Sequence, residues 1–343
     1  MTEKYSSCGT DLVFDQYYVP TDDVGIEIHV RNKRPASMTR FRADRTIVIV
    51  HGATFSSGSL YDVPFNGMSF LDFLAAAGYD VHALDVRGYG HSSRPSEMES
   101  PADESAPVIG TDIGVHDLGV VVDHVRALRG LERVCVFGMS WGGTVAGAYT
   151  SRNADKVEKL ALLAPQWLSD KPIPIDSGGP LGAYRLVPVR ESKGRWLSTA
   201  PEHGRATLIP DGWFEQWADF TLAEDPWSRE RTPNLMRASN GPIQDIRDYW
   251  AAGRKYYNPA EISAPVLLIH GEWDIDVPID LAQALFLELK NAAYRKWVEI
   301  GEATHLVLLE KNRLVAYKAI RDFFDEDYTP EIAESQTTLS SLT

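Results

Sequence analysis

A serine lies between two glycines where an apolar run meets a stretch of small residues. Ser140 is the centre of GMSWG, which places Gly138 and Gly142 two positions to either side. The pattern predicts a strand over 134–137 that turns sharply into a helix over 144–149, because such a corner needs neighbours almost without side chains. The corner would expose the hydroxyl of Ser140 as a nucleophile at the start of a helix. An ordinary serine in a glycine-rich turn is the alternative, and the flanking elements favour the nucleophile.

A serine hydroxyl needs a base, and the base needs an acid that orients it. His305 lies in GEATHLVLLE, between a predicted last strand and a predicted last helix, so we expect it at the same sheet edge as Ser140. The acid is predicted to be Asp274 in GEWDIDVP, which follows another strand by a short loop. Asp276, two residues on, is the competitor for this role.

The elements that would position these residues alternate along the chain. Continuous apolar runs are typical of strands that are buried on both faces of a parallel sheet, and strands that alternate with helices predict an α/β fold. Predicted strands cover 25–31, 134–137 and 157–165 and begin at 46, 80, 264 and 295; predicted helices cover 69–78, 112–129, 144–149, 281–290 and 312–324.

Residues 166–260 break this alternation. They contain many prolines, no evident strand, and six of the nine tryptophans: Trp167, Trp196, Trp213, Trp217, Trp227 and Trp250. We interpret 166–260 as a helical cap insertion, 1–165 with 261–325 as the catalytic core, and 326–343 as a mobile acidic and Ser/Thr-rich tail. Aromatic surface of this extent is expected to cover the site, and Trp167, Trp213, Trp217 and Trp250 are the candidate pocket residues. A cap core of its own is the other interpretation of these tryptophans.

The motifs together resemble the α/β-hydrolase superfamily, and in particular its serine esterase-like members with a cap insertion. The order Ser140, Asp274, His305 is the order of nucleophile, acid and base in that family. The resemblance implies an α/β-hydrolase fold, with a mostly parallel central sheet flanked by helices and a helical cap. The matching segments are HGAT (51–54), DVRGYGHS (85–92), GMSWGG (138–143), GEWDIDVP (271–278) and THLVLLE (304–310).

The resemblance also implies an oxyanion hole. In the family, the residue after the His-Gly pair and the residue after the nucleophile supply its N–H groups, which here are Ala53 and Trp141. Haloalkane dehalogenases and epoxide hydrolases are similar but have an aspartate at the position of Ser140. The H-G-G-G loop of many lipases is absent, and GMSWGG is similar to proline iminopeptidases without their H-G-G-P-G loop.

Composition excludes several other classes. The net charge of −14 disfavours nucleic acid and anionic membranes as partners. No signal peptide and no apolar run of membrane-spanning length is evident, so we expect a cytoplasmic protein. No zinc-binding pattern occurs, and DVRGYGHS lacks the placement of a nucleotide loop, so we expect no cofactor and no metal.

The leading hypothesis is a hydrolase for a carboxylic ester or lactone, a small molecule with an apolar or aromatic group, with mono-alkyl esters of aromatic acids as one candidate. C–C bond hydrolysis, aminopeptidase activity or acyl transfer by the same triad, and a non-enzymatic ligand receptor, are the alternatives. The sequence leaves open the oligomeric state and which cap arginine would bind an anionic substrate. The candidates for that last role are Arg185, Arg190, Arg195, Arg205, Arg237 and Arg247.

Overall fold

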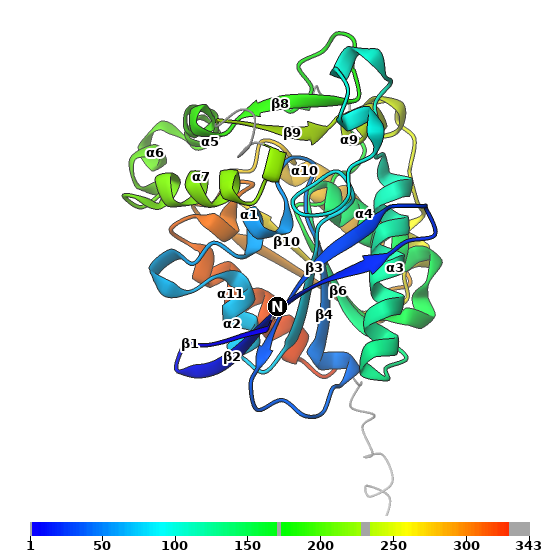
Figure 1. Cartoon of the computed structure of the whole chain (residues 1–343), viewed down its shortest axis with the longest axis vertical. Coiled ribbons are helices and arrows are strands. Elements are labelled where there is room, and N and C mark those ends of the chain that lie inside the picture. Colours follow the sequence, from blue (N-terminus) through cyan, green and yellow to red (C-terminus); the bar gives the residue numbers. More distant parts are fainter. Residues whose placement is uncertain (1, 170–172, 228–233, 329–343) are drawn as a thin grey trace, which may run out of the picture.

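A mixed sheet forms the centre of the protein, whose computed structural model describes residues 2–169, 173–227 and 234–328 (Figure 1). Within these residues the sheet has nine strands in the order β1-β2-β3-β5-β4-β6-β7-β10-β11. The strands are β1 Thr2–Ser7, β2 Thr10–Pro20, β3 Glu27–Pro35, β4 Thr46–Val50, β5 Asp80–Leu84, β6 Val134–Met139, β7 Val157–Leu163, β10 Val266–Gly271 and β11 Arg295–Ile300.

The sheet is parallel where the candidate site lies and antiparallel at its other end. All neighbouring strands from β5 to β11 are parallel, whereas β1, β2, β3 and β5 pair antiparallel. Every residue of β4, β5 and β6 is buried, as continuous apolar runs predict for strands covered on both faces. The predicted α/β architecture is confirmed. The antiparallel strands β1 and β2 were not predicted, because their half-exposed residues form no such run.

Helices cover both faces of the sheet. In Figure 1, α3 and α4 lie on one side, and α2 and α11 on the other. Helix α2 begins with a capping box, in which Ser69 Oγ accepts the N–H of Asp72 at 3.0 Å. Helix α3 ends at Gly130, whose φ of 65° suits a glycine. The core helices are α1 Ser57–Tyr61, α2 Phe70–Ala76, α3 Thr111–Arg129, α4 Trp141–Arg152, α10 Ile279–Glu288 and α11 Arg313–Asp325.

The insertion forms a cap over one end of the sheet (Figure 1). Its described elements are β8 Tyr184–Pro188, α5 Ser192–Ser198, α6 Glu202–Leu208, α7 Trp213–Ala223, β9 Leu235–Ser239, α9 Gly241–Asp245 and the π-helix η7 Ile246–Trp250. The helices agree with the expectation, but the expectation of no strand is wrong, because β8 and β9 pair antiparallel. The two strands are 46 residues apart from the end of β8 to the start of β9, so no local turn signal reveals the pairing.

Specific contacts hold the cap on the core. Trp217 Nε1 in α7 donates to the carbonyl of Ser59 in α1 at 3.1 Å. Arg94 Nη2 pairs with Asp225 at 3.3 Å, and Arg31 on β3 pairs with Glu224. Both carboxylates follow the end of α7, so this helix is fastened to the core at its C-terminal end.

Within the described chain, no helix is long and apolar enough to cross a membrane. Of the tail expected to be mobile, residues 329–343 lie outside the described residues.

Candidate active site

Ser140 lies at a strained corner that only its glycine neighbours permit. It has φ 59° and ψ −125° and directly precedes the first residue of α4. A Cβ at Gly138 would lie 2.2 Å from the carbonyl oxygen of Gly142, and a Cβ at Gly142 would lie 2.3 Å from the carbonyl oxygen of His51. Because these contacts are with backbone atoms, any larger residue would force the strand and the helix apart. The corner therefore has the geometry that the spacing of GMSWG predicts.

His305 and Asp274 meet above the same sheet edge. The Nδ1 atom of His305 lies 2.8 Å from Oδ2 of Asp274. The other oxygen of this carboxylate accepts the backbone N–H groups of Asp276 at 2.9 Å and Val277 at 2.8 Å. These bonds hold the carboxylate in place, so in its neutral form His305 carries its proton on Nδ1, towards Asp274, and Nε2 is the free base.

Asp276, the competing acid, has a different partner. Its carboxylate accepts Nη2 of Arg195, in the cap helix α5, at 2.7 Å. It still belongs to the same group of charges, since ligand atoms of Asp274, Asp276 and His305 all lie within 4.8 Å of one another. The geometry thus gives the two aspartates separate tasks, with Asp274 on the imidazole and Asp276 on the cap.

These charges shift the ionisation of His305. Burial is the largest influence and lowers its pKa, but the charge of Asp274 and its hydrogen bond outweigh burial. Asp276 acts in the same direction as Asp274, and Arg195 opposes it. The net effect raises the pKa of His305 to about 9, so the imidazole is a stronger base than a free histidine.

The loop at the end of β4 is arranged to offer an N–H group to the site. His51 Nε2 accepts the backbone N–H of Val86 at 3.0 Å, so its Nδ1 carries the proton and donates to the carbonyl of Gly52 at 2.7 Å. In a trans peptide the C=O and N–H groups point in opposite directions. The N–H of Ala53 therefore points away from the imidazole of His51.

Trp141 is the other residue expected to offer an N–H group. As the first residue of α4, it has no partner for its backbone N–H within the helix. Its indole Nε1 donates to Thr111 Oγ1 at 2.9 Å, which fixes the side chain against α3. Ala53 and Trp141 both line the cavity beside Ser140.

A cavity of about 290 Å³ connects these residues with the cap. Ser140, His305, Ala53 and Trp141 line it from the core. The cap residues that line it include Arg185, Arg195, Trp196, Trp217 and Trp250.

The four candidate tryptophans of the pocket divide into two pairs. Trp217 and Trp250 line the cavity. Trp167 does not, because it packs edge-on against Tyr257 at 5.5 Å, and Trp213 does not, because it stacks on Phe65 of the core at 4.4 Å. The expectation that all four line the pocket is corrected, since Trp167 packs within the insertion and Trp213 packs against the core.

Sequence reasoning missed Trp196 and Glu310. The carboxyl of Glu310 is completely buried and accepts Trp196 Nε1 at 2.8 Å and the N–H of Thr304 at 2.9 Å. Burial raises its pKa. Glu310 thus joins the cap to the loop that carries His305. In the sequence, the only indication of this role is that Glu310 ends the segment THLVLLE, which contains His305.

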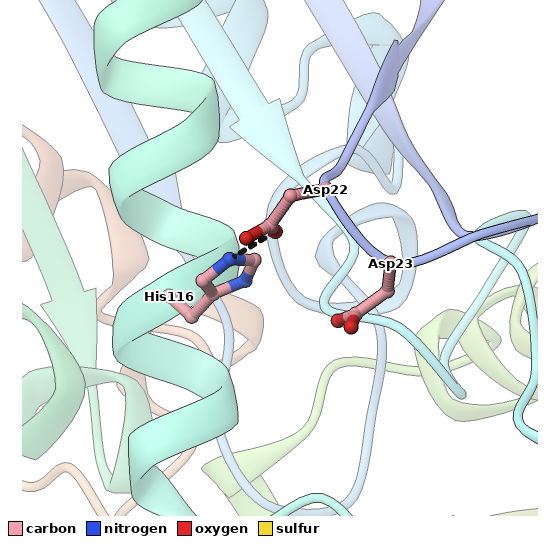
Figure 2. Close-up of side chains that lie close together, drawn as sticks. All are labelled: Asp22, Asp23 and His116. Atoms are coloured by element: carbon pink, nitrogen blue, oxygen red, sulfur yellow. Dashed lines mark hydrogen bonds and ion pairs between the residues drawn. The ribbon is translucent and has the colours of Figure 1, made fainter.

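Two clusters in the described residues have side chains of the kinds that bind metals. One is Asp274, Asp276 and His305, in which His305 Nδ1 pairs with Asp274 and Asp276 pairs with Arg195. The other, Asp22, Asp23 and His116, lies at the surface between α3 and the loop after β2 (Figure 2).

The surface cluster is satisfied by internal partners. His116 Nε2 lies 2.7 Å from Asp22, as Figure 2 shows. Arg87 Nη1 pairs with Asp23 at 2.5 Å, and Arg87 Nη2 donates to His116 Nδ1 at 3.2 Å. The guanidinium occupies the place that a cation would take, so this cluster is an ion-pair network.

Known proteins are similar to this chain in sequence. The sequence profile of the alpha/beta hydrolase fold family matches residues 45–312. The 2-hydroxy-6-oxononadienedioate/2-hydroxy-6-oxononatrienedioate hydrolase of Cupriavidus pinatubonensis is 26% identical over 252 residues, which are 72% of this chain and 76% of that protein.

Solved structures share the fold. The serine hydrolase CarC, involved in carbazole degradation, aligns with a TM-score of 0.59 and 16% identity over 91% of this chain and 99% of its own. A thermophilic esterase from Thermogutta terrifontis aligns with a TM-score of 0.57 and 18% identity over 92% of this chain and all of its own.

The chain belongs to the α/β-hydrolase family. Its fold and its relatives support a hydrolase.

Proposed function

We propose that this protein is a serine hydrolase that cleaves a carboxylic ester or lactone with an apolar or aromatic group. The observation that carries the proposal is the shared cavity of Ser140, at its strained corner, and His305, whose Nδ1 is held 2.8 Å from Asp274. A nucleophile, an oriented base and N–H donors around one cavity are the parts that acyl transfer needs.

The proposed reaction uses each part once. Ser140 Oγ attacks the carbonyl carbon while His305 Nε2 takes its proton, and the Asp274 carboxylate stabilises the imidazolium. The N–H groups of Ala53 and Trp141 stabilise the negative charge that develops on the carbonyl oxygen. His305 then returns the proton to the leaving alcohol, and water hydrolyses the acyl-enzyme by the same route.

Covalent labelling and turnover test the proposal together. A fluorophosphonate should modify Ser140 in the wild type, and Ser140→Ala should remain folded and lose about 10⁶ in kcat on p-nitrophenyl esters. Ser151→Ala is the matched control, because Ser151 lies on the same helix and bonds only the carbonyl of Ala148. Labelling of another serine, or turnover by Ser140→Ala, would contradict the proposal.

C–C bond hydrolysis is a second candidate, favoured by the similarity to the 2-hydroxy-6-oxononadienedioate/2-hydroxy-6-oxononatrienedioate hydrolase of Cupriavidus pinatubonensis. A carbon leaving group must depart with an electron pair, so this reaction needs a substrate in which an adjacent carbonyl stabilises that pair. 2-Hydroxy-6-oxononadienedioate itself can be offered to the enzyme, and loss of its dienol absorbance would be measured. Faster cleavage of this compound than of any ester would make C–C hydrolysis the main reaction.

A further inference from the structure

We propose that Arg185 forms a subsite for a carboxylate of the substrate, so that the enzyme prefers esters whose acid carries a second, ionised carboxyl group. This rests on the proposed function, because the ester would react at Ser140 in the same cavity. The carboxylate would bind beside the loop of Ala53, at the boundary between cap and core.

The guanidinium of Arg185 reaches from β8 to the core. Its Nη1 donates to the carbonyl of Ser239 at 2.6 Å, and its Nη2 donates to the carbonyl of Ala53 at 3.1 Å and to Thr54 Oγ1 at 2.8 Å. All three acceptors are neutral. A guanidinium has five N–H donors, so two remain after these three bonds.

Arg185 differs from the other cap arginines in its partners. Across residues 2–169, 173–227 and 234–328, it forms no ion pair with a carboxylate. Arg205 bonds backbone carbonyls and does not line the cavity. The remaining four are each paired: Arg190 with Asp219, Arg195 with Asp276, Arg237 with Glu99 and Arg247 with Asp176.

The charges that line the cavity therefore do not cancel. His305 is paired with Asp274, and Arg195 with Asp276, which leaves the positive charge of Arg185 without a partner among the described residues. Burial, the largest influence, lowers the pKa of Arg185, Tyr89 opposes it, and the charge of Arg195 lowers the pKa further. Arginine nevertheless stays charged, so a bound anion would stabilise a partly buried charge.

A second polar group in the cavity supports the same ligand. Trp250 is a completely buried residue of the cavity wall, and no described residue accepts a hydrogen bond from its Nε1–H. A carboxylate has two oxygens that can accept several N–H donors, and charge-assisted bonds of this kind are the stronger ones. Ile175, Leu186 and Val187 of the cap also line the cavity and offer an apolar surface that suits the carbon chain between carboxylate and ester.

Arg185 could instead act only as a clamp that holds the carbonyl of Ala53. A clamp would support the turnover of charged and neutral esters equally, whereas a subsite acts on charged esters alone. The ratio of the two activities therefore separates these roles.

The kinetic test compares p-nitrophenyl monoesters of adipic, pimelic and suberic acid with the same esters carrying a terminal carboxamide. At the best chain length, wild-type kcat/KM should be about 10- to 100-fold higher for the carboxylate, and Arg185→Gln should lose this ratio. Arg185→Lys keeps the charge and should retain part of it. Arg190→Gln, a cap variant outside the cavity, should keep the wild-type ratio. A wild-type ratio near one at every length, or an unchanged ratio in Arg185→Gln, would overturn the proposal.

A binding test does not depend on turnover. Calorimetry should show that hexanoate binds the wild type about 10-fold or more tightly than hexanamide, and that Arg185→Gln removes the difference. Equal binding of the two ligands by the wild type, or a difference that persists in Arg185→Gln because hexanoate lies in the oxyanion hole, would reject the subsite. Hydrolysis of neutral esters without a carboxylate preference would refute the subsite alone. Failure of Ser140 labelling would refute the proposed function, and hexanoate would still test Arg185.

Discussion

The core wall of the cavity is held by backbone geometry, whereas its cap wall is held by side chains. On the core side, Gly52, Ser140 and Trp141 occupy strand ends and a helix start that hydrogen bonds and close glycine contacts restrict to one conformation. On the cap side, Arg195 and Trp196 reach the core through single side-chain bonds to Asp276 and Glu310. The difference separates two tasks. Chemistry needs atoms held within fractions of an ångström, while recognition needs a surface that can vary without disturbing them.

The largest effect is expected from a substitution of Asp274 on the core side of the cavity. Asp274→Asn should lower kcat by about 10⁴, because an amide cannot hold His305 in the correct tautomer or stabilise its charge. Asp276→Asn is the matched control and should cost less than about tenfold, since Asp276 bonds Arg195 rather than the imidazole. Steady-state kinetics on one neutral ester measures both variants. A larger loss in Asp276→Asn would reverse the roles.

Glycines test whether the two walls tolerate change differently. Gly142→Ala should destabilise the protein by about 3 kcal/mol or more, because its Cβ would lie 2.3 Å from the carbonyl oxygen of His51. Gly194→Ala in the cap helix α5 should stabilise by about 0.5–1 kcal/mol, because no atom lies within 4 Å of the new Cβ. Urea unfolding of both variants gives the comparison, and equal changes would remove the distinction.

The pH profile sharpens the account of the core wall. With the pKa of His305 raised to about 9, the base is protonated at neutral pH, so kcat/KM should rise about tenfold per pH unit until about pH 9. In Asp274→Asn the charge that raises the pKa of His305 is removed, and burial then lowers this pKa. The rise of kcat/KM with pH should therefore occur at a pH lower by more than about one unit. A rise at the same pH in both proteins would show that Asp274 does not raise the pKa.

The same shift has a consequence for stability. The pKa of His305 is higher in the folded protein than the ordinary value near 6.5. The stabilisation from its pairing with Asp274 is therefore complete below about pH 6.5 and is lost as the pH rises through about 9. The free energy of unfolding of Asp274→Asn, measured as a function of pH, should not show this loss of stability.

The smallest expected effect concerns the cap tryptophans. Trp250→Phe should change the ranking of neutral acyl chain lengths in kcat/KM by about threefold to tenfold, because it reshapes the cavity wall with little loss of packing. Trp213→Phe should leave the ranking unchanged, since Trp213 stacks on Phe65 away from the cavity. The outcome that contradicts this division is a change in ranking with Trp213→Phe and none with Trp250→Phe.

Sequence patterns predicted most of the core because its determinants are local. The run of Thr46–Val50 is buried on both faces as its composition indicates. The glycines around Ser140 are needed for contacts within a few residues of themselves or with one adjoining strand. The positions of Asp274 and His305 after parallel strands place them at one sheet edge, so their convergence follows from topology.

The cap could not be predicted in the same detail because its determinants are long-range. β8 pairs with β9 across a separation of 46 residues, and nothing near either strand indicates the partner. Sequence alone does not distinguish one tryptophan of the insertion from another, or one arginine from another. Only packing distinguishes Trp250 from Trp213, and only the positions of distant carboxylates leave Arg185 without an ion pair in the part of the chain that the structure describes.

By itself, the sequence determined the class of fold, the corner at Ser140 and the order of the three candidate catalytic residues, because hydrophobic periodicity and steric limits at glycine act over a few residues. The tertiary structure alone decided that Asp274 rather than Asp276 bonds His305, that two of the four candidate tryptophans line the cavity, and that Arg185 in the cavity has no carboxylate partner among the described residues. Those outcomes depend on which side chains meet across the boundary of cap and core, and such meetings follow from the packing of the whole chain.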